Sequence, residues 1–289
     1  MRRPHATMHK LAVLADIHGN LAALEAVADH VARWKPDAIV VAGDIVNRGP
    51  RSDECLRFVL SRVAGSGWQA IRGNHEDYVL RVAREPGERP GLEGAVRENV
   101  AWTVHQLGGD VELLDTLPTQ ISLTAPDGGE ARVVHASMRH NRDNILPDTP
   151  DEVLREQIAP APPLICVGHT HRPLIRTIDA TLVVNAGSVG LPFDGDTRAC
   201  YAQLTWRDGW QAAIARVAYD RVRAARDYPT TGFLRDSGVV AELIYDEFRT
   251  ARPRMYRWME RYRDAVLAGE LTPAESVHAY LALLAATGE

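Results

Sequence analysis

Eight residues whose side chains bind metal ions or move protons stand in five short motifs of the chain. They are Asp16, His18, Asp44, Asn74, His75, His135, His169 and His171. Imidazole, carboxylate and carboxamide donors without a cysteine suit manganese, iron, zinc or nickel ions. A lone histidine is usually an ordinary core or surface residue, and a lone aspartate often only caps a turn. Five histidines that follow apolar strand-like runs favour a metal site instead.

The donor set is large enough for two ions. Asp44 is the natural residue to lie between them, because one carboxylate can hold two cations about 3.5–4 Å apart. Such a pair binds the non-bridging oxygens of a phosphoryl group. It also lowers the pKa of a bridging water, which gives a hydroxide for in-line attack. The pattern therefore predicts hydrolysis of phosphate esters, a reaction that is extremely slow without a catalyst.

The first three motifs each follow an apolar run that predicts a buried strand. These runs are residues 11–15, 38–42 and 68–71. The segments between them carry apolar residues at helical spacing, so the order is strand, helix, strand, helix, strand. That order indicates a parallel α/β sheet. Because parallel strands end at the same edge of a sheet, where such sheets bind ligands, the polar clusters are expected to lie together.

The rest of the chain predicts helices, then strands, then helices again. Residues 78–115 are expected to be helical with a loop at 85–91, and packing is favoured over a cap above the substrate. An antiparallel set of strands is expected between residues 120 and 217, with a short helix at 151–158. We divide the chain into a catalytic domain, residues 1–218, and a C-terminal helical extension, residues 219–289.

The extension contains no motif. We expect one or two long helices as far as Tyr262, and a last helix that Thr272 and Pro273 begin and that runs to about residue 286. Its expected role is packing on the core or self-association into a homo-oligomer. At the other end, residues 1–7 are expected to form a tail outside the fold.

Composition narrows the class of protein. The 289 residues are 45% hydrophobic and 25% charged, which is typical of a globular protein. The net charge of −5 argues against nucleic acid as a partner, and no apolar run is long enough to span a membrane. The three cysteines are widely spaced and form no paired motif, which favours a reducing cytoplasm.

The motifs, in their order, resemble those of the calcineurin-like metallophosphoesterase superfamily over residues 11–217. The segment Gly43–Gly49 and the Gly-Asn-His-Glu motif look like phosphoprotein phosphatases and symmetrical diadenosine tetraphosphate hydrolases. Gly-His-Thr-His and the loop 185–190 look like small bacterial phosphodiesterases and phosphatases. The resemblance implies a four-layer α-β-β-α sandwich, with two mixed sheets flanked by helices and a C-terminal helical appendage.

The resemblance also implies the role of each residue. One metal ion would be held by Asp16, His18, Asp44 and His171, and the other by Asp44, Asn74, His135 and His169. His75 would be the general acid or the stabiliser of the transition state, with Glu76 or Asp16 to orient it. Catalytic roles thus fall on Asp44, His75 and Arg48, and substrate contacts on Arg48, Asn74 and His75. Arg139 is a second phosphate-binding candidate, or else a solvated surface charge.

Two positions depart from the pattern of the family. Asn47 stands where the phosphatases usually have Asp, and Ala136 stands where Gly usually follows the histidine. Neither change removes a metal ligand, but both leave the substrate class open. We expect an enzyme that hydrolyses phosphomonoesters or phosphodiesters of small molecules. The alternatives are a protein Ser/Thr phosphatase, a diadenosine tetraphosphate hydrolase, a non-catalytic scaffold and, without support from a basic patch, a DNA nuclease.

Overall fold

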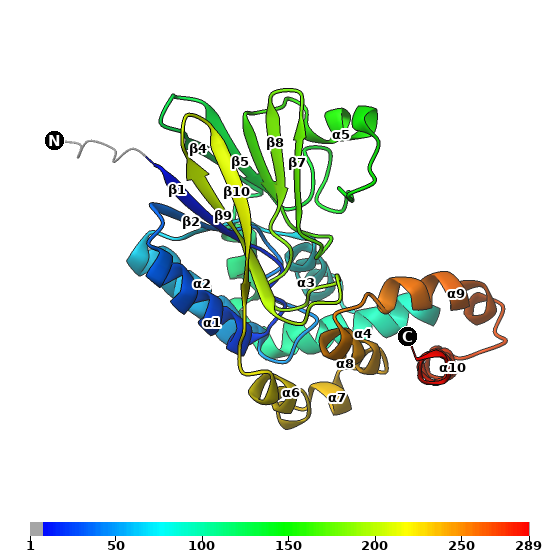
Figure 1. Ribbon diagram of the computed structural model, residues 1–289. Coiled ribbons are helices and arrows are strands. Elements are labelled where there is room, and N and C mark those ends of the chain that lie inside the picture. Colours follow the sequence, from blue (N-terminus) through cyan, green and yellow to red (C-terminus); the bar gives the residue numbers. More distant parts are fainter. Residues whose placement is uncertain (1–7, 289) are drawn as a thin grey trace.

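The computed structural model describes residues 8–288, so the tail expected at residues 1–7 lies outside it. Two five-stranded sheets pack face to face, and helices cover their outer faces (Figure 1). The first sheet has the order β10 (Trp210–Val217), β9 (Ala199–Trp206), β1 (Lys10–Leu14), β2 (Ala38–Val41) and β3 (Gln69–Ala70). The second has the order β4 (Gln120–Thr124), β5 (Glu130–Val134), β6 (Leu164–Val167), β8 (Thr181–Asn185) and β7 (Leu174–Ile178). The predicted sandwich with two mixed sheets is confirmed.

Strand direction agrees with the expectation in the first half of the chain and differs in the second. Strands β1, β2 and β3 are parallel, as predicted. The antiparallel set expected after residue 120 is wrong for β5, β6 and β8, which run parallel to one another. The connection between β5 and β6 contains α5 (Asp151–Ile158) and is long enough to cross back over the sheet, as a parallel pair requires.

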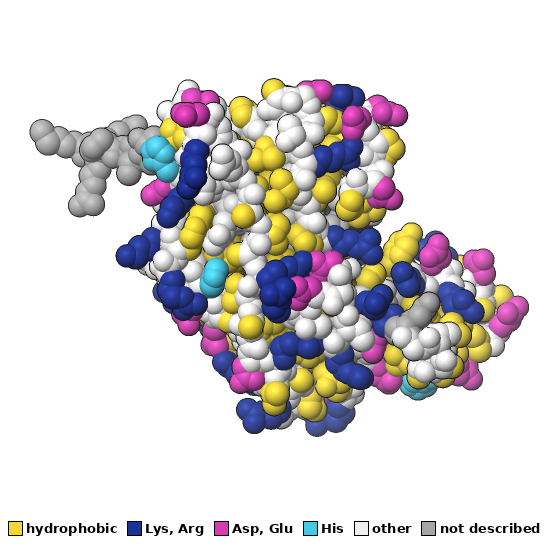
Figure 2. Space-filling model, in the orientation of Figure 1, with side chains coloured by type: hydrophobic (Ala, Val, Ile, Leu, Met, Phe, Trp, Pro, Cys, Tyr) yellow, Lys and Arg dark blue, Asp and Glu magenta, His cyan; other side chains and the backbone are white. Residues whose placement is uncertain are grey.

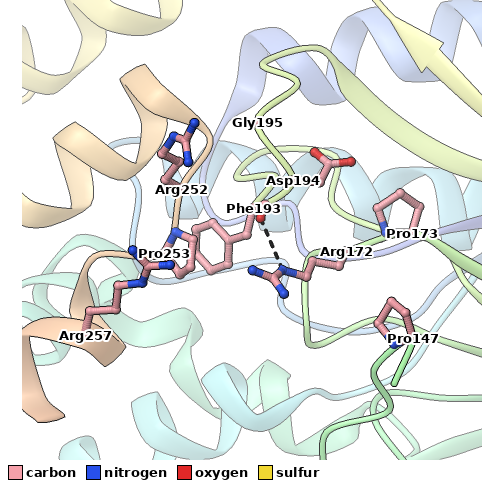
Figure 3. Close-up of a pocket in the computed structure, with 9 residues that line it drawn as sticks. All are labelled: Pro147, Arg172, Pro173, Phe193, Asp194, Gly195, Arg252, Pro253 and Arg257. Carbon is pink, nitrogen blue, oxygen red and sulfur yellow. Dashed lines mark hydrogen bonds between the residues drawn. The ribbon is translucent and has the colours of Figure 1, made fainter. Parts of the chain in front are cut away.

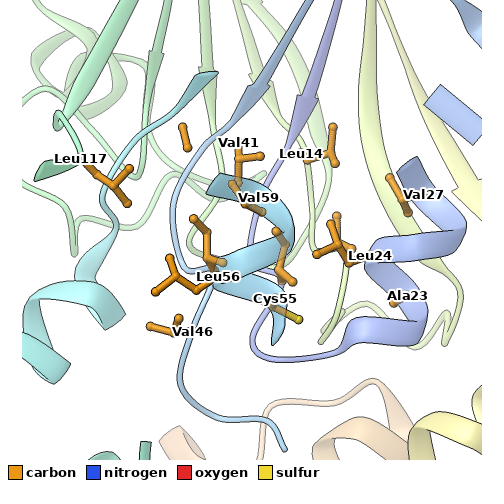
Figure 4. Close-up of a cluster of buried hydrophobic side chains, with 14 of the residues drawn as sticks. Leu14, Ala23, Leu24, Val27, Val41, Val46, Cys55, Leu56, Val59 and Leu117 are labelled. Carbon is orange, nitrogen blue, oxygen red and sulfur yellow. The ribbon is translucent and has the colours of Figure 1, made fainter. Parts of the chain in front are cut away.

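The first sheet is covered by α1 (Leu21–Trp34) and α2 (Ser52–Ser66). The side chain of Asn20 caps α1 by accepting a hydrogen bond from Ala23 N at 3.2 Å. Leu14 and Val41 at the ends of two strands pack against residues of both helices, as Figure 4 shows. Burial of each such side chain contributes about 1.5–3 kcal/mol. This core therefore holds in place the strand ends from which the motif loops begin.

A second core fills the space between the sheets. Val13 and Val40 from the first sheet and Val133 and Cys166 from the second are all fully buried in it. On the outer face of the second sheet, α5 closes a smaller apolar cluster. Because both faces of β1, β2 and β6 are covered, these strands contain nearly continuous apolar runs, and the polar residues of the motifs follow where the strands end.

The segment after β3 is helical, with a break, as predicted. It consists of α3 (Asn74–Arg84), α4 (Gly91–Leu107) and the 3₁₀ helix η1 (Gly108–Thr116). Leu92 and Ala95 of α4 share a buried apolar cluster with Phe233 and Trp258 of the C-terminal helices. Helix α4 therefore packs between the sandwich and the extension, in agreement with the favoured packing role.

The extension contains more and shorter helices than expected. They are α6 (Arg221–Thr230), α7 (Phe233–Asp236), α8 (Val240–Thr250), α9 (Met255–Leu267) and α10 (Pro273–Thr287). Gly232 and Gly238, with φ of 85° and 79°, break the expected long helix, and Pro253 separates α8 from α9. The predicted start of α10 is confirmed, because Thr272 and Glu275 form a capping box. The domain boundary at residue 218 and self-association remain predictions. Within residues 8–288, no helix is long and apolar enough to cross a membrane.

Candidate metal centre

All seven predicted metal ligands lie together at one end of the two sheets. Asp16 and His18 follow β1, Asp44 follows β2, and Asn74 begins α3. His135 follows β5, and His169 and His171 follow β6. Parallel strands of both sheets end at this edge, so residues as far apart in sequence as 16 and 171 become neighbours.

The donors form two groups that share Asp44. In the first group, Asp16, His18, Asp44 and His171 each offer one donor atom, and these atoms lie within 4.8 Å of one another. His18 Nε2 is 3.6 Å from Asp44 Oδ2, and His171 Nε2 is 3.4 Å from Asp16 Oδ1. In the second group, Asp44, His135 and His169 meet the same limit. A carboxylate common to two groups is the arrangement that a pair of bridged ions needs.

Asn74 completes the second group. Its Oδ1 atom is 2.8 Å from His135 Nε2 and 2.9 Å from His169 Nδ1. His135 Nε2 is also 3.3 Å from Asp44 Oδ2, the same oxygen that faces His18 in the first group. Asn74 Oδ1 therefore lies beside donors of the second group, and its role as a metal ligand remains a prediction.

Asp16 and Asp44 each accept a backbone hydrogen bond through one carboxylate oxygen, and the other oxygen has no hydrogen-bond partner in the described part of the chain. Asp16 Oδ2 accepts a hydrogen bond from His169 N, and Asp44 Oδ1 accepts one from His75 N, both at 2.9 Å. Asp16 Oδ1 and Asp44 Oδ2 are buried and have no hydrogen-bond partner within residues 8–288. Buried oxygens are rarely left unpaired, so these two atoms fit metal ligands.

The histidine rings are turned by hydrogen bonds to the backbone. Nδ1 of His135 lies 2.7 Å from Ala42 O, Nδ1 of His18 lies 3.1 Å from Asn47 O, and Nδ1 of His171 contacts Leu191 O. A nitrogen that donates to a carbonyl leaves a lone pair on Nε2 of the neutral ring. The Nε2 atoms of His18 and His171 are 3.1 Å apart, and two lone pairs at that distance repel unless a cation lies between them.

Backbone strain is concentrated in the same loops. Eleven non-glycine residues within 8–288 have positive φ, and seven of them belong to the motif loops. These seven are Asp16, His18, Asp44, Asn47, Arg48, His169 and His171. A left-handed conformation costs free energy at such residues, so the surrounding structure must hold the loops in this shape.

Asp44 is the charge around which the centre is arranged. Burial alone would raise the pKa of the Asp44 carboxyl group. The neighbouring His135 and His75 lower this pKa by more than burial raises it, so it lies well below its usual range. Burial likewise lowers the pKa of His135, yet the Asp44 carboxylate outweighs this and raises it to about 10. Burial, together with His135, lowers the pKa of His169 to about 3. The pKa shifts of Asp44 and His135 therefore each favour the charged form, as expected for a carboxylate and an imidazole in close contact.

Glu76 shapes the loop after β2. Its buried carboxylate accepts backbone hydrogen bonds from Asp44, Ile45, Val46 and Gly73, at 2.7–3.1 Å. Burial, with a smaller effect of Asp44, raises the pKa of Glu76 to about 7. Glu76 therefore joins the two loops that carry Asp44 and Asn74.

The side chain that orients His75 is Asn47, and neither Glu76 nor Asp16 forms a hydrogen bond with this ring among the described residues. Asn47 Nδ2 lies 2.9 Å from His75 Nδ1. Asn47 Oδ1 accepts from Arg48 N at 2.9 Å and from Thr103 Oγ1 at 3.2 Å, which fixes the amide so that Nδ2 donates to the ring. A neutral His75 then carries its proton on Nε2. The sequence marked Asn47 as a departure from the family pattern, but its hydrogen bond to His75 was not predicted.

Arg48 is held by a residue that sequence analysis did not find. Its guanidinium forms an ion pair with Glu247 of α8 and lies 5.6 Å from the centre of the Phe193 ring. Phe193 stacks on the metal-ligand candidate His171, with ring centres 4.3 Å apart. The buried Glu247 also accepts hydrogen bonds from the backbone of Arg254 and Met255, at 2.8 and 2.9 Å. The C-terminal helices therefore reach the edge of the metal centre.

Arg139, the second phosphate-binding candidate, is engaged elsewhere. Its side chain is 40% exposed and forms two hydrogen bonds with Asp143, at 2.6 and 2.9 Å. Glu156 lies 3.6 Å away. None of its hydrogen bonds or ion pairs within residues 8–288 joins it to a metal-ligand candidate. Ala136, the other departure from the family pattern, is buried without displacing His135 from the centre.

Comparison with solved structures supports the fold. A metallophosphoesterase from Sphaerobacter thermophilus has a TM-score of 0.66 and 26% identity, and the match covers 85% of this chain and 100% of that one. A hypothetical protein from Pyrococcus horikoshii has a TM-score of 0.70 at 20% identity, over 84% of this chain and 98% of that one, and shares the fold.

Sequence relatives agree with the structural ones. An uncharacterized protein of Methanocaldococcus jannaschii is 29% identical over 232 residues, 74% of this chain and 89% of that protein. A symmetrical bis(5'-nucleosyl)-tetraphosphatase of Aromatoleum aromaticum is 36% identical over 102 residues, and the match spans about a third of either chain (35% and 34%). The model of the calcineurin-like phosphoesterase superfamily domain matches residues 9–209, more than half of the chain. The chain therefore belongs to the calcineurin-like phosphoesterase superfamily.

Proposed function

We propose that this chain is a metal-dependent phosphoesterase that binds two divalent ions and hydrolyses phosphomonoesters or phosphodiesters of small molecules. One observation carries the proposal: Asp44 Oδ2 is buried, lacks a hydrogen-bond partner among the described residues and faces donors of both groups. Manganese, iron, zinc and nickel all suit the donor set. Bound ions would act as Lewis acids on phosphoryl oxygens and make water a stronger nucleophile at neutral pH.

His75 is the residue that would protonate or stabilise the leaving oxygen. Its backbone N–H is bound by Asp44 Oδ1, and its ring is turned by Asn47, so its position is tied to the centre. With Nδ1 accepting from the amide, Nε2–H is the free donor of the neutral ring. A fixed N–H donor beside the reacting phosphate stabilises the negative charge that develops there.

Arg48 is the residue that would bind a phosphoryl oxygen. Glu247 contacts only one Nη atom of the guanidinium, and Nε is buried without a hydrogen-bond partner within residues 8–288. A guanidinium has five N–H donors, so it can keep an ion pair with a carboxylate and still donate to a phosphate. Retention of the Glu247 contact would hold Arg48 in place when substrate arrives.

The test is the Asp44→Asn variant, assayed with p-nitrophenyl phosphate and bis-p-nitrophenyl phosphate after addition of manganese. Because the amide is neutral and cannot bridge two cations, we expect kcat/KM to fall by about 100-fold or more. Asp208→Asn is a matched control, since Asp208 is exposed and has the same φ of 54° as Asp44. Activity retained in Asp44→Asn would contradict the proposed mechanism. Absence of bound metal and of activity in the wild type would favour a non-catalytic scaffold.

A second candidate function is hydrolysis of dinucleoside tetraphosphates. It is supported by the name of the Aromatoleum aromaticum relative, which covers about a third of this chain. Incubation with diadenosine tetraphosphate and separation of the products by chromatography tests it. Symmetrical cleavage gives ADP alone, whereas asymmetrical cleavage gives AMP and ATP.

A further inference from the structure

A cavity of about 400 Å³ lies where the sandwich meets the C-terminal helices. The sandwich contributes Arg172 and Phe193, and the segment from the end of α8 into α9 contributes Arg252, Pro253 and Arg257, as Figure 3 shows. We call it the arginine cavity. Figure 2 shows Lys and Arg side chains gathered on the surface where these two parts meet. The volume of the arginine cavity is in the range of sites that bind small ligands.

The arginine cavity shares a wall with the metal centre. The ring of Phe193 stacks on His171, and the backbone N–H of Phe193 donates to His171 O at 3.1 Å. Arg172 directly follows His171 in the chain. Arg48, the proposed phosphate ligand, also contacts the Phe193 ring. A molecule bound at the metal centre therefore lies next to this cavity.

Among the residues that the structure describes, the three arginines of the cavity have no acidic partner. No ion pair within residues 8–288 involves Arg172, Arg252 or Arg257, and Arg172 donates only to the backbone oxygen of Phe193, at 3.3 Å. Asp194 also lines the cavity, but it is bound by Arg216. Most other arginines within residues 8–288 that form side-chain hydrogen bonds are paired with carboxylates, such as Arg48 and Arg216. Three unpaired guanidiniums around one cavity attract an anion, and phosphate matches their geometry.

The position of the cavity relative to the metal centre is fixed by Glu247. This buried carboxylate binds Arg48 with one oxygen and the backbone of Arg254 and Met255 with the other. A second link is the hydrogen bond from Gly195 N to Ala251 O, at 3.0 Å. The segment that carries Arg252 and Arg257 is thus tied both to a motif loop and to the loop after β8.

We infer that the arginine cavity is a subsite for a second phosphoryl group of the substrate, so that the enzyme acts on compounds with a chain of phosphates. The inference rests on the proposed function in that the first phosphoryl group would lie at the metal centre. A simple phosphomonoester would leave the three arginines unused. A nucleoside polyphosphate or dinucleoside polyphosphate would occupy both places.

The test measures binding of inorganic tripolyphosphate by calorimetry to the full chain after chelation and desalting. In that state the ions that would bind a phosphoryl group at the metal centre have been removed, and the anionic Asp44 disfavours an anion there. We expect the Arg252→Ala/Arg257→Ala double variant to bind about 100-fold more weakly than the wild type, at about tenfold for each charged hydrogen-bonding partner lost. Arg172→Ala, on the opposite wall, should lose about tenfold.

The control is Arg263→Ala, which removes an exposed arginine of α9 that does not line the cavity. Its affinity for tripolyphosphate should equal that of the wild type, and melting curves should show that all variants fold. Equal affinity in the wild type, the double variant and Arg172→Ala would overturn the inference. Hydrolysis of p-nitrophenyl phosphate by the metal-loaded wild type tests the proposed function separately, since it does not require the second subsite.

Discussion

The metal centre and the arginine cavity meet at Phe193 but are built in opposite ways. In the metal centre the donor side chains are almost all buried, and backbone groups fix them, as Ala42 O does for His135. In the cavity Arg252 and Arg257 are exposed, and no ion pair within residues 8–288 restrains them. Chemistry at a phosphorus atom requires donors in fixed places, whereas attraction of a distant phosphate requires mainly charge.

Removal of metal should give the largest difference between the metal centre, which loses its activity, and the arginine cavity, which keeps its binding. Without a counter-charge for Asp16 Oδ1 and Asp44 Oδ2, we expect hydrolysis of p-nitrophenyl phosphate to fall by about 100-fold or more. The melting temperature should also fall, because an ion that binds only the folded state stabilises it. Both should recover when manganese is added back. Tripolyphosphate binding should persist in the chelated chain, and its loss there would show that the cavity depends on the metal centre.

Glu247→Ala tests the link between the two regions. The change leaves the guanidinium of Arg48 without its acidic partner, and that side chain is only 15% exposed. We expect a loss of about 3 kcal/mol in the free energy of unfolding, measured in urea. Tripolyphosphate affinity should fall as well, because the segment after Ala251 loses its anchor.

Glu242→Ala is the control for this prediction. Glu242 lies on the same helix, is 46% exposed and contacts His278 at 3.3 Å. Its removal should cost less than about 1 kcal/mol, as for surface ion pairs in general. Equal losses in the two variants would mean that Glu247 has no special role in joining the extension to the metal centre.

The metal centre and the arginine cavity also differ in how far the sequence predicts them. Asp16 and Asp44 were predictable as neighbours, because each follows an apolar run and parallel strands end at one edge. The partner of Arg48 was not predictable, since Glu247 is 199 positions away. Helical spacing shows that α8 has an apolar face, but it does not show onto which loop that face will dock. For the same reason the arginines of the cavity carried no signal, and the parallel direction of β5, β6 and β8 was missed.

Substitutions of Asn47 test how closely the ring of His75 must be held beside the metal centre. Replacement with alanine removes the hydrogen bond to His75 Nδ1 and releases the ring, so we expect kcat to fall by about tenfold. Metal content should not change, because the Asn47 side chain is not a ligand candidate. In Asn47→Asp the carboxylate can only accept, so His75 should carry its proton on Nδ1, which nitrogen NMR of the metal-free chain can detect. An unchanged tautomer would contradict the assigned role of Asn47.

Arg139→Ala should have the smallest effect. Since Arg139 is partly exposed and bound to Asp143, we expect kcat/KM to stay within about twofold of the wild type. Burial raises the pKa of Asp143, but hydrogen bonds from Arg139, Gln157 and Ser137 outweigh it and lower the pKa to about 2. A carboxylate with a depressed pKa stabilises the fold above its unfolded pKa, and this stabilisation is lost as pH falls towards 2. The variant should therefore differ from the wild type in stability at neutral pH and approach it below about pH 4. A loss of activity of tenfold or more would restore Arg139 as a substrate ligand, and would mean that an exposed, ion-paired arginine outside the arginine cavity also binds the substrate.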